Sequence, residues 1–447
     1  MLEIKKYDVI VVGAGPAGLS VASELSKELK VLVVDGKSSI SKTTKSWFVP
    51  KEVCDIGEAG DILEYTYPGV KRFLADTFTG VKDKAWESEL EGGYLYIKEH
   101  EVLEYWGEII TKNSSEILLE CNYLDHQVEK EKEYPVTIHT TKGNFESKLL
   151  VDASGYDSLI REKYHLKDEK LYWWSVYGAI MKHKDGIPQD MKVGDYMFWQ
   201  TFKNTNPDVS TSLNEGRPVF EYEVLDENSS FPLILFLKDS QVSFDIMKDT
   251  FNEVMKEKKV MSKYNDCEIQ EIKYGWYPSG GVSQYIAEDN VTFVGDAACW
   301  TTPCGWGFAF IVKNYKRYAR NLITAFEKNE FDKDTLDSLI GLKTDEKFQI
   351  LFNKVATRIL SIGDTELLDK IILLFNKIGF IYCEKTFTLT ITTEDIISII
   401  VELIKNLEFD ILKKIFTVED IKWLKEELSD KLEGTVSRII DSIEKIM

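Results

Sequence analysis

The feature that most constrains this chain is a glycine-rich turn between two apolar segments near its start. Tyr7–Val12 leads into Gly13-Ala14-Gly15-Pro16-Ala17-Gly18, and Val31–Val34 ends at Asp35. The pattern predicts a strand, a turn, a helix and a second strand that ends in an acidic residue. A GxGxxG spacing has little weight alone, but within a βαβ unit it is typical of a dinucleotide-binding fold. We therefore expect a Rossmann-type domain here.

The turn also predicts how a dinucleotide would bind. Gly13 permits a tight turn, Gly15 lets the backbone approach a pyrophosphate, and Gly18 allows helix and strand to pack closely. The pyrophosphate would lie at the helix N-terminus, where free N–H groups and the helix dipole favour an anion. Asp35 would accept hydrogen bonds from an adenosine ribose. An ordinary βαβ turn without ligand is the alternative, which the context disfavours. The expected cofactor-binding residues of this segment are Gly13, Gly15, Pro16, Ala17, Gly18 and Asp35.

Composition limits the class of protein. The chain has 447 residues, long enough for two or three domains, and a net charge of −20, which argues against nucleic acid because phosphate binding needs a basic face. Its six cysteines do not suggest a disulfide scaffold. The first strand begins too early for a signal peptide, and no apolar run approaches the roughly 18 residues that span a bilayer. We expect a cytoplasmic protein, with peripheral membrane contact left open.

The segments after the first βαβ unit predict a discontinuous nucleotide-binding domain. Expected strands are Tyr94–Ile97, Glu116–Leu119, Val136–Thr140 and Lys148–Val151, and expected helices are Val70–Phe78 and Glu101–Thr111. Hairpin strands interrupt the βαβ pattern, which indicates that the domain is assembled from separated parts of the chain. We assign residues 1–170 and 275–330 to it.

Residues 171–274 predict a second domain with an antiparallel sheet. Its expected strands are rich in aromatic and β-branched residues: Trp173–Lys182, Asp195–Phe202, Val219–Val224 and Leu233–Lys238, with a helix over Asp245–Lys259. A buried strand at Val291–Val294 and a helix over Trp306–Lys328 follow. Residues 331–447 form an expected helical region, with helices over Asp364–Lys377, Thr393–Asn406 and Thr417–Leu432. The fold class is α/β with an α+β insertion.

Two further segments repeat the pattern of a strand that ends in a polar turn. The first is Asp152-Ala153-Ser154-Gly155, followed by Ser158 and Arg161; the second is Gly295-Asp296, followed by Pro303, Gly305 and Gly307. Together with the first turn, over about residues 5–325, they resemble flavoproteins of the para-hydroxybenzoate hydroxylase type. That superfamily includes aromatic hydroxylases, flavin halogenases, geranylgeranyl reductases and lycopene cyclases.

The resemblance implies that the dinucleotide is FAD. Asp296, at the end of a strand, would accept hydrogen bonds from ribityl hydroxyls or reach the pyrophosphate through water. Pro303, Gly305 and Gly307 would leave backbone N–H groups at a helix start facing the flavin ring. A loop that merely joins strand to helix is the alternative. The resemblance adds Gly155, Gly295, Asp296, Pro303, Gly305 and Gly307 to the expected cofactor-binding residues.

Within the superfamily the chain is most similar to lycopene cyclases and geranylgeranyl reductases. Val176–Ile180, Tyr196–Trp199 and Tyr277–Gly281 match short motifs of the cyclases. The cyclases place paired glutamates after a Phe-Leu strand, whereas this chain has Phe236-Leu237-Lys238-Asp239-Ser240 there. Asp239 is therefore the candidate catalytic acid. Asp296 is retained, as in the redox members.

These patterns predict an FAD-dependent oxidoreductase that acts on an apolar, isoprenoid-type substrate by hydride transfer from reduced FAD, with NAD(P)H as a candidate electron donor. Three alternatives stay open: a cyclase that uses reduced FAD without net redox change, a flavin monooxygenase or halogenase, and a flavin-binding protein without turnover. The halogenase Trp-x-Trp-x-Ile-Pro motif is absent; Gly275–Pro278 is only a fragment of it. Flavin reduction at a substrate-dependent rate would separate an enzyme from a binding protein.

The remaining candidates are weaker. Aromatic residues of the second domain could line a tunnel for a polyprenyl chain or form an ordinary core. Cys299 and Cys304 could be a redox pair or small apolar fillers. The histidines show no ligand spacing, so we expect no metal. The C-terminal helices could be a lid, a dimer surface or a membrane-facing element, and the oligomeric state is left open.

Overall fold

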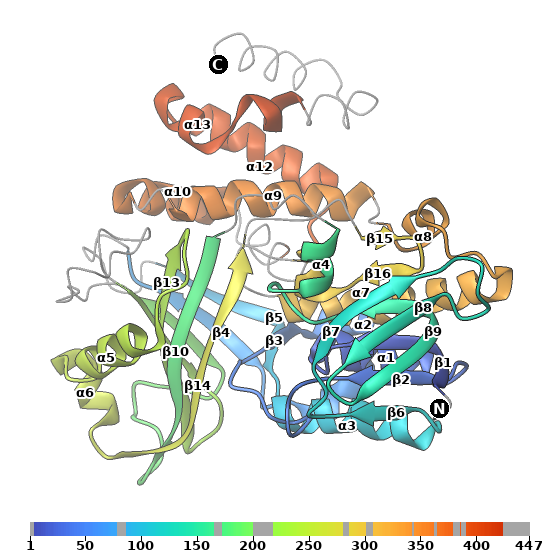
Figure 1. Ribbon diagram of the computed structural model, residues 1–447. Coiled ribbons are helices and arrows are strands. Elements are labelled where there is room, and N and C mark those ends of the chain that lie inside the picture. Colours follow the sequence, from blue (N-terminus) through green and yellow to red (C-terminus); the bar gives the residue numbers. More distant parts are fainter. Residues whose placement is uncertain are drawn as a thin grey trace.

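The computed structural model describes residues 4–77, 86–164, 172–199, 218–279, 286–300, 307–341, 344–361, 364–378, 385 and 390–422. These residues form two eight-stranded sheets with helices around both, and a group of C-terminal helices above them (Figure 1).

The first sheet is built around parallel strands. Its order is β15 (Ala287–Glu288), β16 (Val291–Phe293), β9 (Gly143–Asp152), β1 (Lys5–Val12), β2 (Val31–Val34) and β6 (Glu116–Leu118), and β8 (Val136–Thr140) and β7 (Tyr123–Val128) extend from β9. From β16 to β6 every neighbouring pair is parallel. All four residues of β2 and all three of β16 are buried, as expected for a parallel sheet covered on both faces.

Three helices pack together beside this sheet. α1 (Pro16–Leu25) packs between α3 (Glu99–Lys112) and α7 (Gly307–Lys328). Eight of the ten residues of α1 are buried, so the helix that starts at the glycine turn is held on most of its circumference. Because the strands are parallel, the turns after β1, β2, β9 and β16 all open at the same edge of the sheet.

The second sheet is mainly antiparallel. Its order is β14 (Cys267–Ser279), β10 (Tyr172–His183), β13 (Ser229–Lys238), β12 (Val219–Val224), β11 (Asp195–Trp199), β4 (Val70–Ala75), β5 (Trp86–Tyr96) and β3 (Phe48–Pro50). Only β11 and β4 pair in parallel among its described ladders. The helices α5 (Phe244–Val254) and α6 (Lys258–Tyr264) cover one face, at the left of Figure 1.

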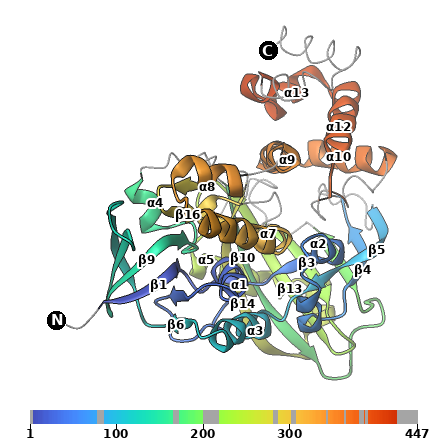
Figure 2. The same ribbon diagram turned by 90° about the vertical axis from the view of Figure 1, so that its right-hand side faces the viewer.

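The other face of this sheet packs against the C-terminal helices. These are α9 (Thr344–Ser361), α10 (Thr365–Ile378), α12 (Thr393–Asn406) and α13 (Phe409–Ile415), which share one hydrophobic cluster with strands β10, β12 and β13. Figure 2 shows them at the end of the molecule away from α1 and α3, whereas α8 (Lys333–Ile340) lies beside α7. Among the described residues, no helix combines the length and the apolar character needed to span a membrane.

Several expected elements differ from the structure. Val70–Phe78, expected as a helix, contains strand β4 (Val70–Ala75), because pairing with β5 and β11 on either side overrides a weak local pattern. The single helix expected over Asp245–Lys259 is two helices, α5 and α6, that meet near residue 256. The helix expected over Thr417–Leu432 lies within the described residues only up to Lys422.

The second sheet also takes strands from a part of the chain that we assigned to the nucleotide-binding domain. Strands β3, β4 and β5 lie within residues 48–96, and β14 extends beyond 274. The sequence between these strands includes α2 (Lys51–Ile56) and the 3-10 helix η1 (Gly60–Tyr65). The local sequence does not show that these strands join the second sheet, because each strand pairs with partners far away in the chain. The domain boundaries themselves stay a prediction.

Candidate functional site

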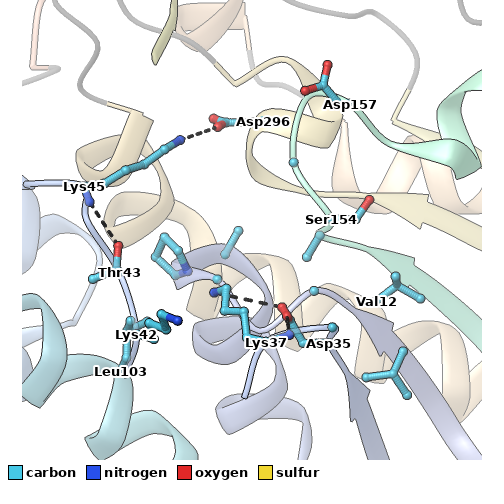
Figure 3. Close-up of a pocket in the computed structure, with 18 of the residues that line it drawn as sticks. Val12, Asp35, Lys37, Lys42, Thr43, Lys45, Leu103, Ser154, Asp157 and Asp296 are labelled. Atoms are coloured by element: carbon cyan, nitrogen blue, oxygen red, sulfur yellow. Dashed lines mark hydrogen bonds and ion pairs between the residues drawn. The ribbon is translucent and has the colours of Figure 1, made fainter. Parts of the chain in front are cut away.

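A cavity of about 870 Å³ opens at the carboxyl edge of the first sheet (Figure 3). Its walls come from the glycine turn, the ends of β2 and β9, the loop 36–45, the start of α7, and Tyr277 and Pro278 of β14. The cavity therefore reaches from the first sheet to the second. Its volume lies within the usual range for cofactor and ligand sites, roughly 300–1,000 Å³.

The glycine turn has the geometry that a bound phosphate group requires. A Cβ on Gly13 would lie 2.3 Å from the Ala153 carbonyl oxygen, and one on Gly18 would lie 1.9 Å from the Gly13 carbonyl oxygen. A Cβ on Gly15 would meet no protein atom within 4 Å, so the space above it belongs to the cavity. Gly15 is also the N-cap of α1 and no side chain caps it, which leaves the first N–H groups available to an anion.

Asp35 joins the glycine turn to the loop that follows it. Its Oδ2 accepts a hydrogen bond from the Ala14 N–H at 2.6 Å, and its Oδ1 accepts one from the Lys37 N–H at 2.7 Å. The Lys37 ammonium donates to the Ala14 carbonyl at 3.2 Å and lies 4.0 Å from Asp35 Oδ2. Burial lowers the pKa of Lys37, and the Asp35 charge opposes that effect. Asp35 thus lines the cavity, and its contact with a ribose stays a prediction.

Three lysines of the loop 36–45 line the same cavity, and our reading of the sequence did not single them out. They are Lys37, Lys42 and Lys45. The Lys45 ammonium lies 3.8 Å from Asp296 Oδ2 and 5.1 Å from the ring centre of Tyr277, so it faces the far end of the cavity from Lys37 (Figure 3). Cations beside a helix N-terminus favour a phosphate-containing ligand. Their position in the loop directly after Asp35 is the sequence feature that could have identified them as site residues.

The second predicted segment is held by a buried carboxylate. Asp152 at the end of β9 accepts hydrogen bonds from Ser154 N–H at 3.0 Å, from Ser154 Oγ at 2.6 Å and from the Ser158 hydroxyl. Burial raises the pKa of Asp152, while these donors oppose the shift. Ser158 in turn caps α4 (Leu159–Lys163). The network presents Gly155, at φ +97° and with open space above it, to the cavity.

The third segment reaches the cavity from β16. Gly295 has φ +65°, and a Cβ there would lie 2.7 Å from the Cβ of Ala17 on α1. Asp296, in the 3-10 helix η2 (Gly295–Ala298), and Gly307, the first residue of α7, both line the cavity. Pro303 and Gly305 lie outside the described residues, as does Cys304, so their predicted roles stay predictions. Cys299 is buried, with φ +53°.

The structure does not bring Asp239 to this cavity. The residue lies in an exposed turn directly after β13 and is absent from the described wall of the cavity. Its proposed role as a catalytic acid stays a prediction. In the part of the chain that the structure describes, no three His, Cys, Asp or Glu side chains are grouped so that they could hold a metal ion.

The chain is similar to several known proteins. The family model "lycopene cyclase protein" matches residues 8–406. An uncharacterized protein, MJ1520, of Methanocaldococcus jannaschii is 22% identical over 82% of this chain and 90% of its own length. Capsanthin/capsorubin synthase of Citrus sinensis is 27% identical over 51% of this chain and 42% of its own length.

Solved structures share the fold. A geranylgeranyl bacteriochlorophyll reductase-like protein of Thermoplasma acidophilum superposes with a TM-score of 0.69 at 16% identity, over 95% of this chain and all (100%) of its own. Aklavinone-11 hydroxylase, in a complex with FAD and aklavinone, has a TM-score of 0.60 at 16% identity, over 83% of this chain and 71% of its own. With the family model matched over most of its length, the chain belongs to the lycopene cyclase family, within the FAD-dependent hydroxylase-type flavoprotein superfamily.

Proposed function

We propose that the protein is an FAD-dependent oxidoreductase that transfers hydride from reduced FAD to an apolar, isoprenoid-type substrate. The observation that carries the proposal is the cavity in which the ends of four strands, β1, β2, β9 and β16, each with a glycine or carboxylate, meet two helix N-termini. A site of this shape suits a long molecule with a diphosphate in its middle.

The residues fit FAD in a definite order. The open space above Gly15, at the start of α1, suits the pyrophosphate, and Asp35 suits the adenosine ribose. Asp296 and Gly307 suit the flavin half, because they line the end of the cavity that Tyr277 of the second sheet closes. FAD in the solved complex of aklavinone-11 hydroxylase, which has the same fold, supports this choice of cofactor.

The flavin supplies hydride when it is bound and reduced, and the chain has to place an apolar substrate against it. Tyr277 of β14 lines the cavity and packs against the hydrophobic cluster on the inner face of the second sheet. Trp47, which is buried and also lines the cavity, stacks on Phe308 of α7 with 4.9 Å between ring centres. The family, the carotenoid synthase and the geranylgeranyl reductase-like structure support an isoprenoid-type substrate. NAD(P)H is the proposed electron donor.

The test starts from the visible spectrum of the purified protein. We expect bound FAD, slow reduction by NADPH or NADH under argon, faster reduction or faster reoxidation in the presence of lycopene micelles, and a product two hydrogen atoms heavier than the substrate. Rapid reaction of the reduced protein with air would favour a monooxygenase instead. A protein without flavin after reconstitution would contradict the proposal.

A non-redox cyclase is the second candidate, and the family model favours it. The two reactions differ in the mass of the product. A cyclase leaves the mass of lycopene unchanged and leaves the reduced flavin unconsumed, whereas a reductase oxidises one flavin for each double bond lost. Asp239, which follows the Phe236-Leu237 strand where the cyclases place paired glutamates, would be the acid of a cyclase, although it is exposed.

A further inference from the structure

Two glutamates of the second sheet are buried on the same face of one strand. Glu221 and Glu223 lie on β12, all six residues of which are buried, and the two side chains are 6% and 2% exposed. Residues two apart on a strand point to the same side. Phe220 and Tyr222 point to the other side, into the cluster under α5 and α6. The glutamates therefore share the face that the C-terminal helices cover, with Val219.

Their polar partners are few. The Tyr196 hydroxyl donates to Glu221 Oε2 at 2.5 Å. Glu223 Oε2 and the hydroxyl of Tyr96 are both buried, and neither has a hydrogen-bond partner within the described residues. Glu99, on α3, adds negative charge to both Glu223 and Tyr96, although it is itself paired with the buried Lys273 at 3.0 Å. Polar atoms left open in this way point to a group or water that the pair is built to meet.

The surroundings keep a proton on the pair. Burial raises the pKa of Glu221 to about 8. Burial raises the pKa of Glu223 well above its ordinary value, and the nearby charges of Glu221 and Glu99 raise it further. No described lysine or arginine forms an ion pair with either carboxyl group. At neutral pH Glu223 is therefore a neutral acid inside the protein, the protonation state that a proton donor needs.

A connected group of aromatic rings adjoins the pair through Tyr196, Phe231 and Tyr96. We call it the aromatic cage: Phe48, Phe73, Tyr96, Tyr196 and Phe231. Tyr96 lies 5.2 Å from Phe48 and 5.6 Å from Phe231, measured between ring centres, and Phe231 is the cross-strand neighbour of Glu223. The π faces of such rings attract positive charge. An acid among aromatic rings suits the protonation of an electron-rich double bond, which places positive charge on carbon.

The cage adjoins the cavity of the cofactor site. Phe48 follows Trp47, which lines the cavity, and stands on β3 beside Tyr96 of β5. Tyr277, another residue of the cavity wall, interacts electrostatically with Tyr96. Tyr96 and Tyr277 belong to one hydrophobic cluster, and Tyr96 also interacts electrostatically with Glu223, so aromatic residues connect the wall of the cavity to the carboxyl pair.

A purely structural role is the alternative, and the sheet chemistry disfavours it. Burying a carboxyl group without full hydrogen bonding costs stability, and apolar residues of similar size pack such a strand better. β12 buries two of them side by side, and the neighbouring strand β13 has apolar residues at the facing positions Leu233 and Phe231. A structural strand would have no need of either acid.

We propose that Glu223 is the proton donor of the reaction and that Glu221, held by Tyr196, returns the proton to it. The inference rests on the proposed function for its substrate. The O–H bond of the Glu223 carboxyl group breaks, and a C–H bond forms with the π electron pair of a substrate double bond. Hydride from reduced flavin completes the reduction at the other carbon, so one double bond gains two hydrogen atoms and the flavin is oxidised. Glu221 and solvent then restore the proton to Glu223.

The first experiment reads the carboxyl groups without turnover. We expect the infrared spectrum of the FAD-loaded protein at neutral pH to contain the C=O band of a neutral carboxylic acid. The band should weaken in Glu223→Gln, and it should shift when lycopene in micelles is added. Glu268→Gln, a substitution of an exposed glutamate on β14, is the matched control and should leave the band unchanged. A band that is missing in the wild-type protein, or that lycopene does not shift, overturns the proposal.

The second experiment follows the proton itself. In D₂O the wild-type product should have one deuterium for each hydride transferred, and Glu223→Gln should lose turnover by roughly 10²–10⁴-fold while binding FAD normally. Glu221→Gln should slow turnover less, because solvent can still replace the proton. Turnover at the wild-type rate in Glu223→Gln overturns the donor role. Absence of turnover in the wild type contradicts the proposed function instead, and the lycopene-dependent infrared shift then still decides whether the pair meets the substrate.

Discussion

The two sheets differ in the surroundings that they give to their acidic side chains. At the carboxyl edge of the first sheet, Asp152 accepts hydrogen bonds from Ser154 and Ser158, and Asp35 accepts them from the N–H groups of Lys37 and of Ala14 in the glycine turn. The space beside Gly15 and Gly155 is open. On the inner face of the second sheet, Glu221 and Glu223 are buried among aromatic rings with few donors. One edge is arranged to hold charged groups, and the other face is arranged to keep acids neutral.

The difference follows from how each region is assembled. The first site comes from short turns at the ends of β1, β2, β9 and β16, and its hydrogen bonds join residues within one turn, as at Asp152, or the ends of adjacent strands, as between Asp35 and Ala14. The second site depends on strands that are distant in sequence, such as β5 and β12, and on helices that come after residue 344. Hydrogen-bond donors and open space at the first site favour the ionised form of a carboxyl group. Burial with few donors at the second site favours the neutral form.

The largest expected effect is the loss of FAD binding at the first site. Gly15→Val should abolish FAD binding, because its side chain would occupy the open space at the start of α1 where a pyrophosphate would lie. Bound flavin for each chain after purification measures this. Gly60→Val is the matched control, since a Cβ there also meets no atom within 4 Å but lies away from the cavity. Full yellow occupancy in Gly15→Val would show that the cofactor lies elsewhere.

The next effect concerns the second site and appears as a pH dependence of stability. The folded protein holds a proton on Glu221 between the ordinary carboxyl pKa of 4.5 and the raised pKa of about 8, whereas the unfolded chain releases it. Stability therefore falls as the pH rises through this window. In Glu221→Gln the unfolding midpoint in urea should decline less between about pH 5 and about pH 8. Parallel profiles for variant and wild type would mean that Glu221 is ionised in the folded protein.

A smaller effect is expected at the ribose position. Asp35→Ala removes the acceptor that holds the glycine turn and would contact the ribose, and it should weaken FAD binding by about 1–3 kcal/mol, or roughly 5- to 150-fold. Titration of the apo-protein with FAD gives the dissociation constant. Asp8→Ala is the control, because Asp8 also accepts a backbone hydrogen bond, from Lys30, but does not line the cavity. An unchanged constant in Asp35→Ala would make Asp35 a structural residue only.

The smallest expected effect tests the alternative acid. Asp239→Asn should change turnover little, because the side chain is exposed and lies outside the described wall of the cavity. A general acid contributes roughly 10²–10⁴-fold, so the two possibilities are well separated. Steady-state turnover with lycopene, together with the flavin spectrum, measures the outcome. A near-total loss of turnover with an intact spectrum would restore the cyclase interpretation and reduce Glu223 to a buried structural acid.

Much of the first region could be read from the chain. The elements of the βαβ unit form where the pattern predicted them, and Gly155, Asp296 and Gly307 line one cavity with the glycine turn, whereas Gly295 packs against Ala17 of α1. Their contacts with a cofactor stay predictions. The three lysines of the loop were missed, because positive charge in a loop is ordinary until its neighbours are known. The strand Val70–Ala75 was read as a helix, since its pairing partners lie in β5 and β11.

The amino-acid sequence alone determined the cofactor turn, because its pattern lies within one short βαβ unit: three glycines at fixed spacing and an acid at the end of the next strand. The close approach of Ala153 to Gly13 came only with the tertiary structure. Only the tertiary structure decided the state of Glu221 and Glu223. In the sequence they are two charged residues of a strand. Their burial, and with it their protonation, comes from eight paired strands and the C-terminal helices that close over one face. The desolvation of a group depends on everything that surrounds it, so a local sequence pattern does not predict it.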